Sequence, residues 1–507
     1  MAETQNHFSF VAADEAATLR CAAWLASILA AHMAESKGGL LVSLEGDLGA
    51  GKTAFARGLI QARCGAHTVV PSPSFALVQP YENTAPPIWH ADLYRLGEAS
   101  EVEELGLIDA LADQLCLIEW AERAHGFLPE ADITIKLDED ERDARQISVK
   151  AAPHIITALA TAAAREEALS QFLSDAGWQD AERRALAGDA STRRYERLTQ
   201  NGMDAVLMDW ARGPDGPPVY DGQPYSRVAH LAEAMPAYCR MVDWLGEHGL
   251  CASTIWARDE AQGFALMQDF GDRHIANDSD LDRAVFYHET VETLLHLHAQ
   301  GPADFLPAYD GAVQAVEASL FLDWFLPFRG IEVSAEARRC FLDFWRAAGD
   351  KLATDKPVTV LRDYHSVNLL WRETAQARFR IGLIDVQDAL AGHAAYDLAS
   401  LLCDARVDVA PKYEAQGLAH YMAARFGDDD AARADFEAAY ALCLMQRNLK
   451  IAGIFVRLAE RDKKPGYLRH LPRIMGYIER ALAHEALAPI RIWLTDNAPQ
   501  ALESAID

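Results

Sequence analysis

Hydrophobic and polar positions divide the first third of the chain into alternating helices and strands. Residues 12–34 carry apolar side chains at helical spacing, residues 40–44 form a short apolar run, and a second helical pattern follows over 52–62. Two later apolar runs, 88–92 and 115–119, have the length of buried strands and each ends in an acidic residue. Strands that alternate with helices in this way predict an α/β domain.

The turn after the first apolar run has the spacing of a phosphate-binding loop. Its sequence is Gly-Asp-Leu-Gly-Ala-Gly-Lys-Thr, residues 46–53. Glycines allow the backbone to bend so that N–H groups face phosphate oxygens, and the N-terminus of the following helix attracts the same anion. An ordinary glycine turn is the alternative, but the strand before and the helix after favour nucleotide binding. The residues expected to bind the nucleotide are Gly46, Gly49, Gly51, Lys52 and Thr53, with the lysine on the β- and γ-phosphates and the threonine on Mg²⁺.

Three further polar residues are expected near this loop. Ser74 follows a rigid segment with two prolines and is placed to sense the γ-phosphate or Mg²⁺, although an ordinary turn serine has the same appearance. Asp92 and Glu119 each end a strand, where a carboxylate beside a phosphate loop typically holds the Mg²⁺ shell or orients water. Residues 132–137 and 146–151 alternate around a polar turn and predict a closing hairpin.

The motifs GDLGAGKT, SPSF, HADLYR and LIEW, in this order, resemble the TsaE (YjeE) family. The resemblance covers nearly all of residues 1–150 and implies a P-loop NTPase fold. It also implies the ATPase subunit of the bacterial machinery that makes threonylcarbamoyladenosine (t6A) in tRNA, acting with TsaB- and TsaD-type partners. By resemblance, Asp92 serves the metal and Glu119 orients or activates the hydrolytic water. Ser74 stands where the family usually has threonine, which keeps the hydroxyl group.

Beyond residue 150 the pattern changes to an Ala-rich helix and then to a second domain. We expect a first domain over 1–152 and a second over 165–507, with the boundary between 150 and 165. Residues 186–198 predict a hairpin with a small-residue turn. In this turn Gly188 and Ser191 could let the backbone approach phosphate oxygens, with Arg193 or Arg194 beside them, but a plain turn is the simpler interpretation.

The strongest chemical pattern of the second domain begins at Asp363. Asn368 follows five residues later and opens an apolar strand, and a second apolar strand leads to Asp385. Phosphoryl transfer needs a carboxylate that accepts the hydroxyl proton, and an amide and an acid that hold Mg²⁺. We therefore expect Asp363 to be the base, with Asn368 and Asp385 as metal ligands.

These residues resemble the aminoglycoside phosphotransferase and choline kinase superfamily, which has an α+β, two-lobed protein-kinase-like fold. The motifs GDASTRRY, LRDYHSVNLL, LIDVQDA and QRNLKIAGIF are closer to the AmgK branch. This resemblance implies a small lobe over about 165–270, a large lobe over about 271–507, and ATP-dependent phosphorylation of the anomeric hydroxyl of N-acetylmuramate and N-acetylglucosamine during cell-wall recycling. Gln446, Arg447 and Asn448 either face the sugar or form a hydrogen-bonded helix face.

One residue of the superfamily pattern is missing. The lysine expected on the third strand of the small lobe is absent, because that strand reads Val206-Leu207-Met208-Asp209. Either an arginine, Arg193 or Arg194, neutralises the phosphates, or nucleotide binding is weakened. Two alternatives therefore stay open: the second domain is a non-catalytic, ligand-binding regulator of the ATPase, or it is a kinase for aminoglycosides, other amino-sugars or amino-alcohols.

Composition restricts the remaining choices. The net charge of −28 argues against direct binding of DNA or RNA, which needs a cationic surface. The eight cysteines are scattered without metal-ligand spacing, as in a protein of a reducing compartment. No uninterrupted apolar window long enough for a membrane span and no secretory signal pattern are visible. We expect a cytoplasmic protein that uses ATP and Mg²⁺.

Overall fold

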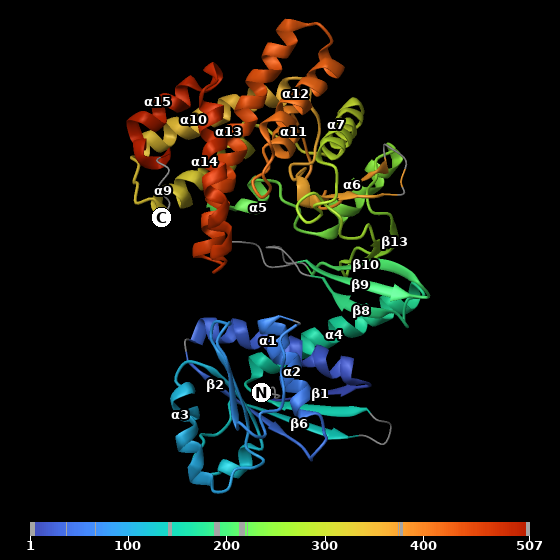
Figure 1. Cartoon of the computed structure of the whole chain (residues 1–507), viewed down its shortest axis with the longest axis vertical. Helices are drawn as coiled ribbons and strands as arrows, with labels where there is room; N and C mark the ends of the chain where they lie inside the picture. The colour runs from blue at the N-terminus through green and yellow to red at the C-terminus, as the bar shows by residue number, and fades with distance from the viewer. Residues whose placement is uncertain are drawn as a thin grey trace. The chain divides into compact units, whose positions relative to one another are not determined.

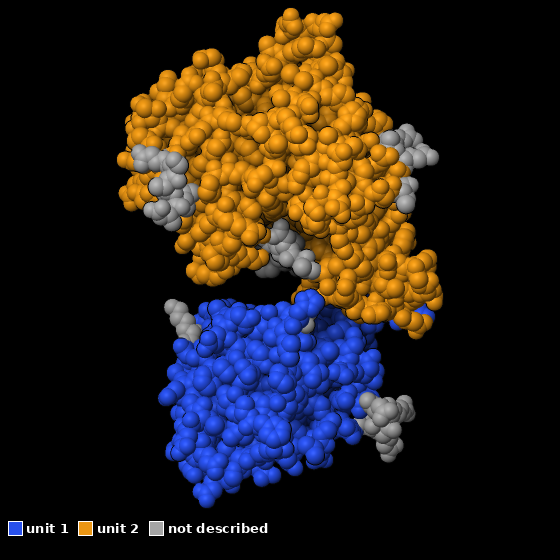
Figure 2. Space-filling view, in the orientation of Figure 1, with its two compact units in different colours: residues 1–179 blue, residues 180–507 orange. Residues whose placement is uncertain are grey.

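The computed structural model places the chain in two compact units, residues 1–179 and 180–507, coloured separately in Figure 2. The division follows Gln179 rather than falling between 150 and 165. The reason is helix α4 (Pro153–Asp175), which packs on helix α1 (Glu15–Ser36) and strand β1 (His7–Ala12) of unit 1. The structure describes residues 6–36, 38–65, 67–139, 144–186, 193–211, 218–220, 222–373, 375 and 379–502.

Unit 1 is built on a seven-stranded sheet in the order β1-β7-β6-β2-β5-β4-β3. The central strands β6, β2, β5 and β4 run parallel, whereas β1, β7 and β3 join the edges in antiparallel pairs. The predicted strands and the closing hairpin are confirmed. Their bounds are β2 Leu40–Glu45, β3 Val78–Tyr81, β4 Ile88–Asp92, β5 Leu115–Glu119, β6 Ile133–Glu139 and β7 Arg145–Lys150.

Helices cover both faces of this sheet (Figure 1). Side chains alternate between the faces of a strand, so Val42 of β2 faces the layer of α1, α2 (Lys52–Cys64) and α4, while Leu41 faces α3 (Leu107–Ala110). Among the described helices, α1 alone is long and apolar enough to cross a membrane. It packs closely along α2 and buries Leu25 and Leu29 in the core of unit 1, as a core helix does.

Unit 2 begins with a five-stranded antiparallel sheet in the order β13-β14-β10-β9-β8. Helix α6 (Met235–Glu247) buries one apolar face, including Met241 and Leu245, in the core that it shares with β10 and β14. The predicted strands over 205–210 and 263–271 correspond to β10 and β14. The strands are β8 Glu182–Ala185, β9 Arg194–Gln200, β10 Met203–Asp209, β13 Ile255–Asp259 and β14 Phe264–Gln268.

The rest of unit 2 is mainly helical (Figure 1). Its centre is the long helix α13 (Asp430–Glu460), which packs against α8, α11 and α14. Two short antiparallel strand pairs, β15 with β18 and β16 with β17, lie between α10 and α11 in sequence and flank the segment around Asp363. The other main elements are α7 Arg283–Ala299, α8 Gly311–Leu320, α10 Ala335–Thr354, β15 Val358–Val360, β16 Leu369–Trp371, β17 Ile381–Leu383, β18 Leu390–Gly392, α11 Ala395–Leu402, α12 Pro411–Phe426, α14 Leu471–Leu482 and α15 Ala488–Asn497.

Candidate active sites

The loop between β2 and α2 has the backbone geometry of an anion cradle. Gly46, Gly49 and Gly51 have positive φ angles of 140°, 92° and 98°. A Cβ atom on Gly46 would lie 2.3 Å from the carbonyl oxygen of Leu137, so only glycine fits there. Gly51 precedes α2 and no side chain caps the helix, so the first N–H groups remain available for phosphate oxygens. This loop therefore fits a nucleotide.

Lys52 is held against its own loop. Its Nζ atom donates hydrogen bonds to the carbonyl oxygens of Gly46 (2.6 Å) and Asp47 (2.8 Å) and lies 3.9 Å from the ring centre of Trp120. Burial lowers the pKa of Lys52, and nearby carboxylates, Glu119 first among them, oppose this shift. To reach a phosphate, the ammonium group exchanges these carbonyl contacts for phosphate oxygens.

Strand pairing brings the predicted polar residues of unit 1 together. Asp92 and Glu119 are direct neighbours at the ends of the parallel strands β4 and β5. The hydroxyl of Thr53 donates to Glu119 at 2.9 Å. Ser74 donates to Asp92, as does Ser72 at 2.8 Å. An acceptor-rich group of oxygens beside the phosphate loop is the ligand set that Mg²⁺ prefers.

His90 belongs to this group although the sequence did not single it out. Its Nε2 atom lies 2.9 Å from a carboxylate oxygen of Glu119, and its side chain is fully buried. His90 stands two residues before Asp92 on β4, so both point to the same face of the sheet. The alternating directions of the side chains along β4 could have identified His90 from the sequence.

In unit 2, the segment that carries Asp363 is fixed by a buried carboxylate. The oxygens of Asp397 on α11 accept hydrogen bonds from the backbone N–H groups of Leu361 (2.7 Å) and Arg362 (2.9 Å). Burial raises the pKa of Asp397 to about 7. Arg362 adopts a positive φ of 66°, which turns the chain just before Asp363.

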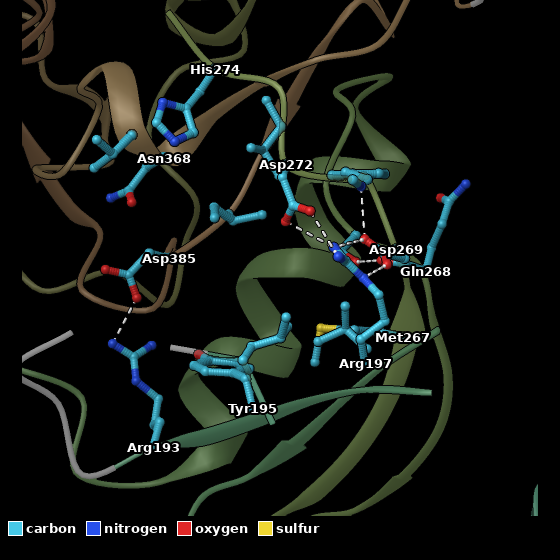
Figure 3. Close-up of a pocket in the computed structure, with 18 of the residues that line it drawn as sticks. Arg193, Tyr195, Arg197, Met267, Gln268, Asp269, Asp272, His274, Asn368 and Asp385 are labelled. Carbon is cyan, nitrogen blue, oxygen red and sulfur yellow. Dashed lines mark hydrogen bonds and ion pairs between the residues drawn. The ribbon is translucent and has the colours of Figure 1, made fainter. Parts of the chain in front are cut away.

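Asp363, Asn368 and Asp385 line one cavity of about 900 Å³. Figure 3 labels Asn368 and Asp385 in this cavity. The side-chain amide of Asn368 donates to the carbonyl oxygen of Asp363 at 3.0 Å. The hairpin of β16 and β17 then places Ile384 against Asn368 through a backbone hydrogen bond of 3.2 Å, so that Asp385 follows beside the amide. An amide and a carboxylate side by side fit Mg²⁺, and the separate carboxylate of Asp363 fits a base.

The charges around Asp363 favour its ionised form. Burial alone would raise the pKa of its carboxyl group, but His365, Lys450, Arg362 and Arg447 together lower it below the usual range. Burial lowers the pKa of His365, so this imidazole becomes charged, and helps to lower the pKa of Asp363, only at acidic pH. Asp363 is therefore ready to accept a proton.

Two arginines line the same cavity, and they differ in their partners (Figure 3). Arg193 donates to Asp385 at 2.6 Å and to the side chain of Gln387 at 2.7 Å. Arg197 of β9 lies opposite Val206 of β10, and its guanidinium group is bound by the carboxylates of Asp269 and Asp272. The sequence did not indicate Arg197, because these carboxylates lie about seventy residues further along the chain.

The remaining predicted residues of this cavity have different positions. Arg194 is exposed on β9 and does not line the cavity. Gly188 and Ser191 lie outside the described residues. On α13, the amide of Gln446 donates to Glu317 at 3.0 Å and that of Asn448 to the carbonyl oxygen of Leu444 at 2.8 Å. These two residues therefore form hydrogen bonds within the protein, and neither lines this cavity.

Known proteins resemble the two units separately. A model of the threonylcarbamoyl adenosine biosynthesis protein TsaE matches residues 12–147, and one of the phosphotransferase enzyme family matches residues 182–440. The tRNA threonylcarbamoyladenosine biosynthesis protein TsaE of Haemophilus influenzae is 42% identical over 137 residues, 27% of this chain and 84% of that protein. An N-acetylmuramate/N-acetylglucosamine kinase of Caulobacter vibrioides is 34% identical over 355 residues, 66% of this chain and 97% of that protein.

Solved structures include a choline kinase from Cryptosporidium parvum, with a TM-score of 0.42 and 12% identity over 65% of this chain and 99% of that one. The family matches confirm both resemblances and both fold classes that the motifs predicted. The chain therefore belongs to two families, with a TsaE region of P-loop NTPase fold over residues 12–147 and, over residues 182–440, a phosphotransferase-family region of protein-kinase-like fold that is similar to N-acetylmuramate/N-acetylglucosamine kinases.

Proposed function

We propose that unit 2 transfers the γ-phosphoryl group of ATP to the anomeric hydroxyl of N-acetylmuramate or N-acetylglucosamine, a reaction suited to cell-wall recycling. The observation that carries this proposal is the shared cavity of Asp363, Asn368 and Asp385. The similarity to N-acetylmuramate/N-acetylglucosamine kinases supports the choice of acceptor.

Asp363 is the base of this reaction. Its lowered pKa keeps the carboxylate ionised, so it accepts the proton of the sugar hydroxyl as that oxygen bonds to the γ-phosphorus. The bond between the γ-phosphorus and the bridging oxygen breaks, and ADP leaves. Asn368 and Asp385 would hold Mg²⁺, which neutralises phosphate charge when it is bound.

Arg193 is the phosphate-binding cation in this proposal. It lines the cavity, and its present partner is the metal ligand Asp385. Binding of nucleotide and metal would release Arg193 from Asp385 and give its guanidinium group new anionic partners. Such a group can bind phosphate oxygens in a bidentate way, which compensates for the missing lysine.

For unit 1 we propose ATP hydrolysis that supports t6A formation in tRNA, together with TsaB- and TsaD-type proteins. Lys52 binds the phosphates, Thr53 and Asp92 serve Mg²⁺, and Glu119 orients the attacking water. The acidic net charge of the chain favours action through protein partners in the cytoplasm rather than direct contact with nucleic acid.

An acceptor panel tests the proposal for unit 2. The chain is incubated with ATP, Mg²⁺ and, separately, each sugar, an aminoglycoside, choline and ethanolamine, and phosphorus NMR identifies the product. We expect an anomeric sugar phosphate, and its loss in Asp363→Asn. Preferential phosphorylation of an aminoglycoside or amino-alcohol would contradict the proposed acceptor. No phosphorylation of any acceptor would favour the non-catalytic regulator.

A further inference from the structure

A second, smaller cavity lies directly beside Asp363. Its volume is about 100 Å³. It shares Asp363, His365 and Arg406 with the cavity of about 900 Å³ that Asn368 and Asp385 line. Because a water molecule occupies about 30 Å³ in the liquid, this space can hold a carboxylate and a few carbon atoms. A group that enters it from the acceptor would leave the reacting hydroxyl near Asp363.

Cationic side chains gather around this small cavity. Arg406, Arg447 and Lys450 all line it. Lys450 is already neutralised, because its ammonium group lies 2.9 Å from a carboxylate oxygen of Glu317. The same carboxylate also binds Arg362, so a single acid serves two cations. Asp363 and Asp404 also line the cavity, so with Glu317 and Arg362 included four cations face three carboxylates, an excess of one positive charge that an anionic ligand would balance.

Among the cations that line the small cavity, Arg447 has a buried donor group without a partner in the described part of the chain. Its side chain is only 3% exposed, and within the described part of the chain its Nη1 atom has no hydrogen-bond partner. Leaving a buried guanidinium N–H group unpaired is costly, whereas a bound carboxylate would satisfy it with a charge-assisted hydrogen bond. Gln446 and the amide nitrogen of Asn448 donate within the protein. The Nε atoms of Arg433 and Arg457 on the same helix also lack a hydrogen-bond partner in the described part of the chain, but neither arginine lines the small cavity.

We infer that Arg447 binds the carboxylate of N-acetylmuramate and gives this acceptor an advantage over N-acetylglucosamine. The inference rests on the proposed function. The two sugars differ in one group, a lactic acid ether that carries a single carboxylate, and the small cavity beside Asp363 has the charge and the size for this group. Arg447 thereby determines specificity, while Asp363 does the chemistry on both sugars.

The intact chain provides the first test, which needs no substitution. We compare kcat/KM for N-acetylmuramate, its methyl ester and N-acetylglucosamine. We expect kcat/KM for the acid to exceed that for the ester by roughly 10- to 150-fold, because a charge-assisted hydrogen bond in a buried site contributes this much to binding. Equal turnover of acid and ester would overturn the inference.

Substitution of Arg447 provides the second test. We expect Arg447→Met to lower kcat/KM for N-acetylmuramate by the same factor, while kcat/KM for N-acetylglucosamine stays within about threefold of the value for the intact chain. Arg447→Lys should recover part of the loss. Arg433→Met, on the same helix outside both cavities, is the matched control and should change neither rate. Equal losses on both sugars in Arg447→Met would refute the role of Arg447 in recognising the carboxylate. If the intact chain phosphorylates neither sugar, the proposed function itself fails and this inference with it.

Discussion

At the scale of single residues, the structure separates two arginines that the sequence treats alike. Arg193 and Arg194 are neighbours in the chain, and either could replace the missing lysine of the small lobe. Arg193 lines the cavity of Asp363, Asn368 and Asp385, whereas Arg194 is exposed at the start of β9. The direction of each side chain depends on how β9 pairs with β10, which a single sequence does not reveal.

Substitution of each arginine in turn tests this difference, with Arg194 as the control for Arg193. Arg193→Met should raise the KM for ATP in sugar phosphorylation by roughly 10- to 100-fold, because a charge-assisted contact to phosphate is lost. Arg194→Met removes the same charge one residue away and should leave the KM for ATP within about twofold of the value for the intact chain. Steady-state kinetics at saturating sugar measures both. Equal effects of the two substitutions would mean that Arg193 acts only through overall charge.

The pKa of Asp363 gives a second prediction at this scale. A carboxylate base acts in its ionised form, so a lower pKa extends the pH range in which kcat/KM is high toward lower pH. His365 is one of the groups that lower this pKa. In His365→Asn we therefore expect the acid limb of the pH profile to move to higher pH, measured with the same ATP and sugar in both proteins. A shift toward lower pH would contradict the electrostatic role of His365.

At the scale of elements, a buried ion cluster joins α8 to α13 and to the segment before Asp363. Glu317 of α8 binds Arg362 and, at 2.9 Å, Lys450 of α13, and it also accepts the hydroxyl hydrogen bond of Tyr309. These residues come from distant parts of the sequence and carry no common motif. Only the packing of α13 against α8 shows that one carboxylate serves both cations.

We expect Glu317→Gln to lower the free energy of unfolding by about 3–5 kcal/mol, because two buried cations lose their partner. Burial raises the pKa of Glu317, but Lys450 and Arg362 outweigh this effect and lower it to about 2, from an ordinary value of 4.5. The stabilisation is therefore complete above about pH 4.5 and is lost as the pH falls toward 2. Urea unfolding at several pH values measures this. Asp343→Asn, which removes an exposed ion pair with Arg346, is the control and should change stability by less than about 0.5 kcal/mol.

The phosphate loop gives a second prediction at this scale. Gly46→Ala places a Cβ atom 2.3 Å from a backbone oxygen of β6, so the loop has to shift. We expect the ATPase activity of unit 1 to fall by at least about tenfold, since positioning errors of this size are costly. Gly38→Ala has no heavy atom within 4 Å of the added Cβ and should retain full activity. Unchanged activity in Gly46→Ala would show that the loop tolerates this shift.

At the scale of the whole molecule, the sequence predicted both families and both fold classes, because each site depends on motifs that are nearly contiguous. Lys52 and Thr53 lie in one loop, and Asp363 and Asn368 are five residues apart. It did not indicate His90, Arg197 or the excess charge around Arg447. Those features arise from pairing between distant elements, which only the folded chain brings into contact.

The central claim is that one chain carries two independent nucleotide sites on different folds. The most direct measurement is ADP release with N-acetylmuramate in the intact chain, in Asp363→Ala and in Lys52→Ala. We predict that Asp363→Ala abolishes the sugar-dependent release, a fall of at least about 100-fold, while Lys52→Ala leaves it unchanged. Loss of sugar-dependent release in both variants would contradict the claim.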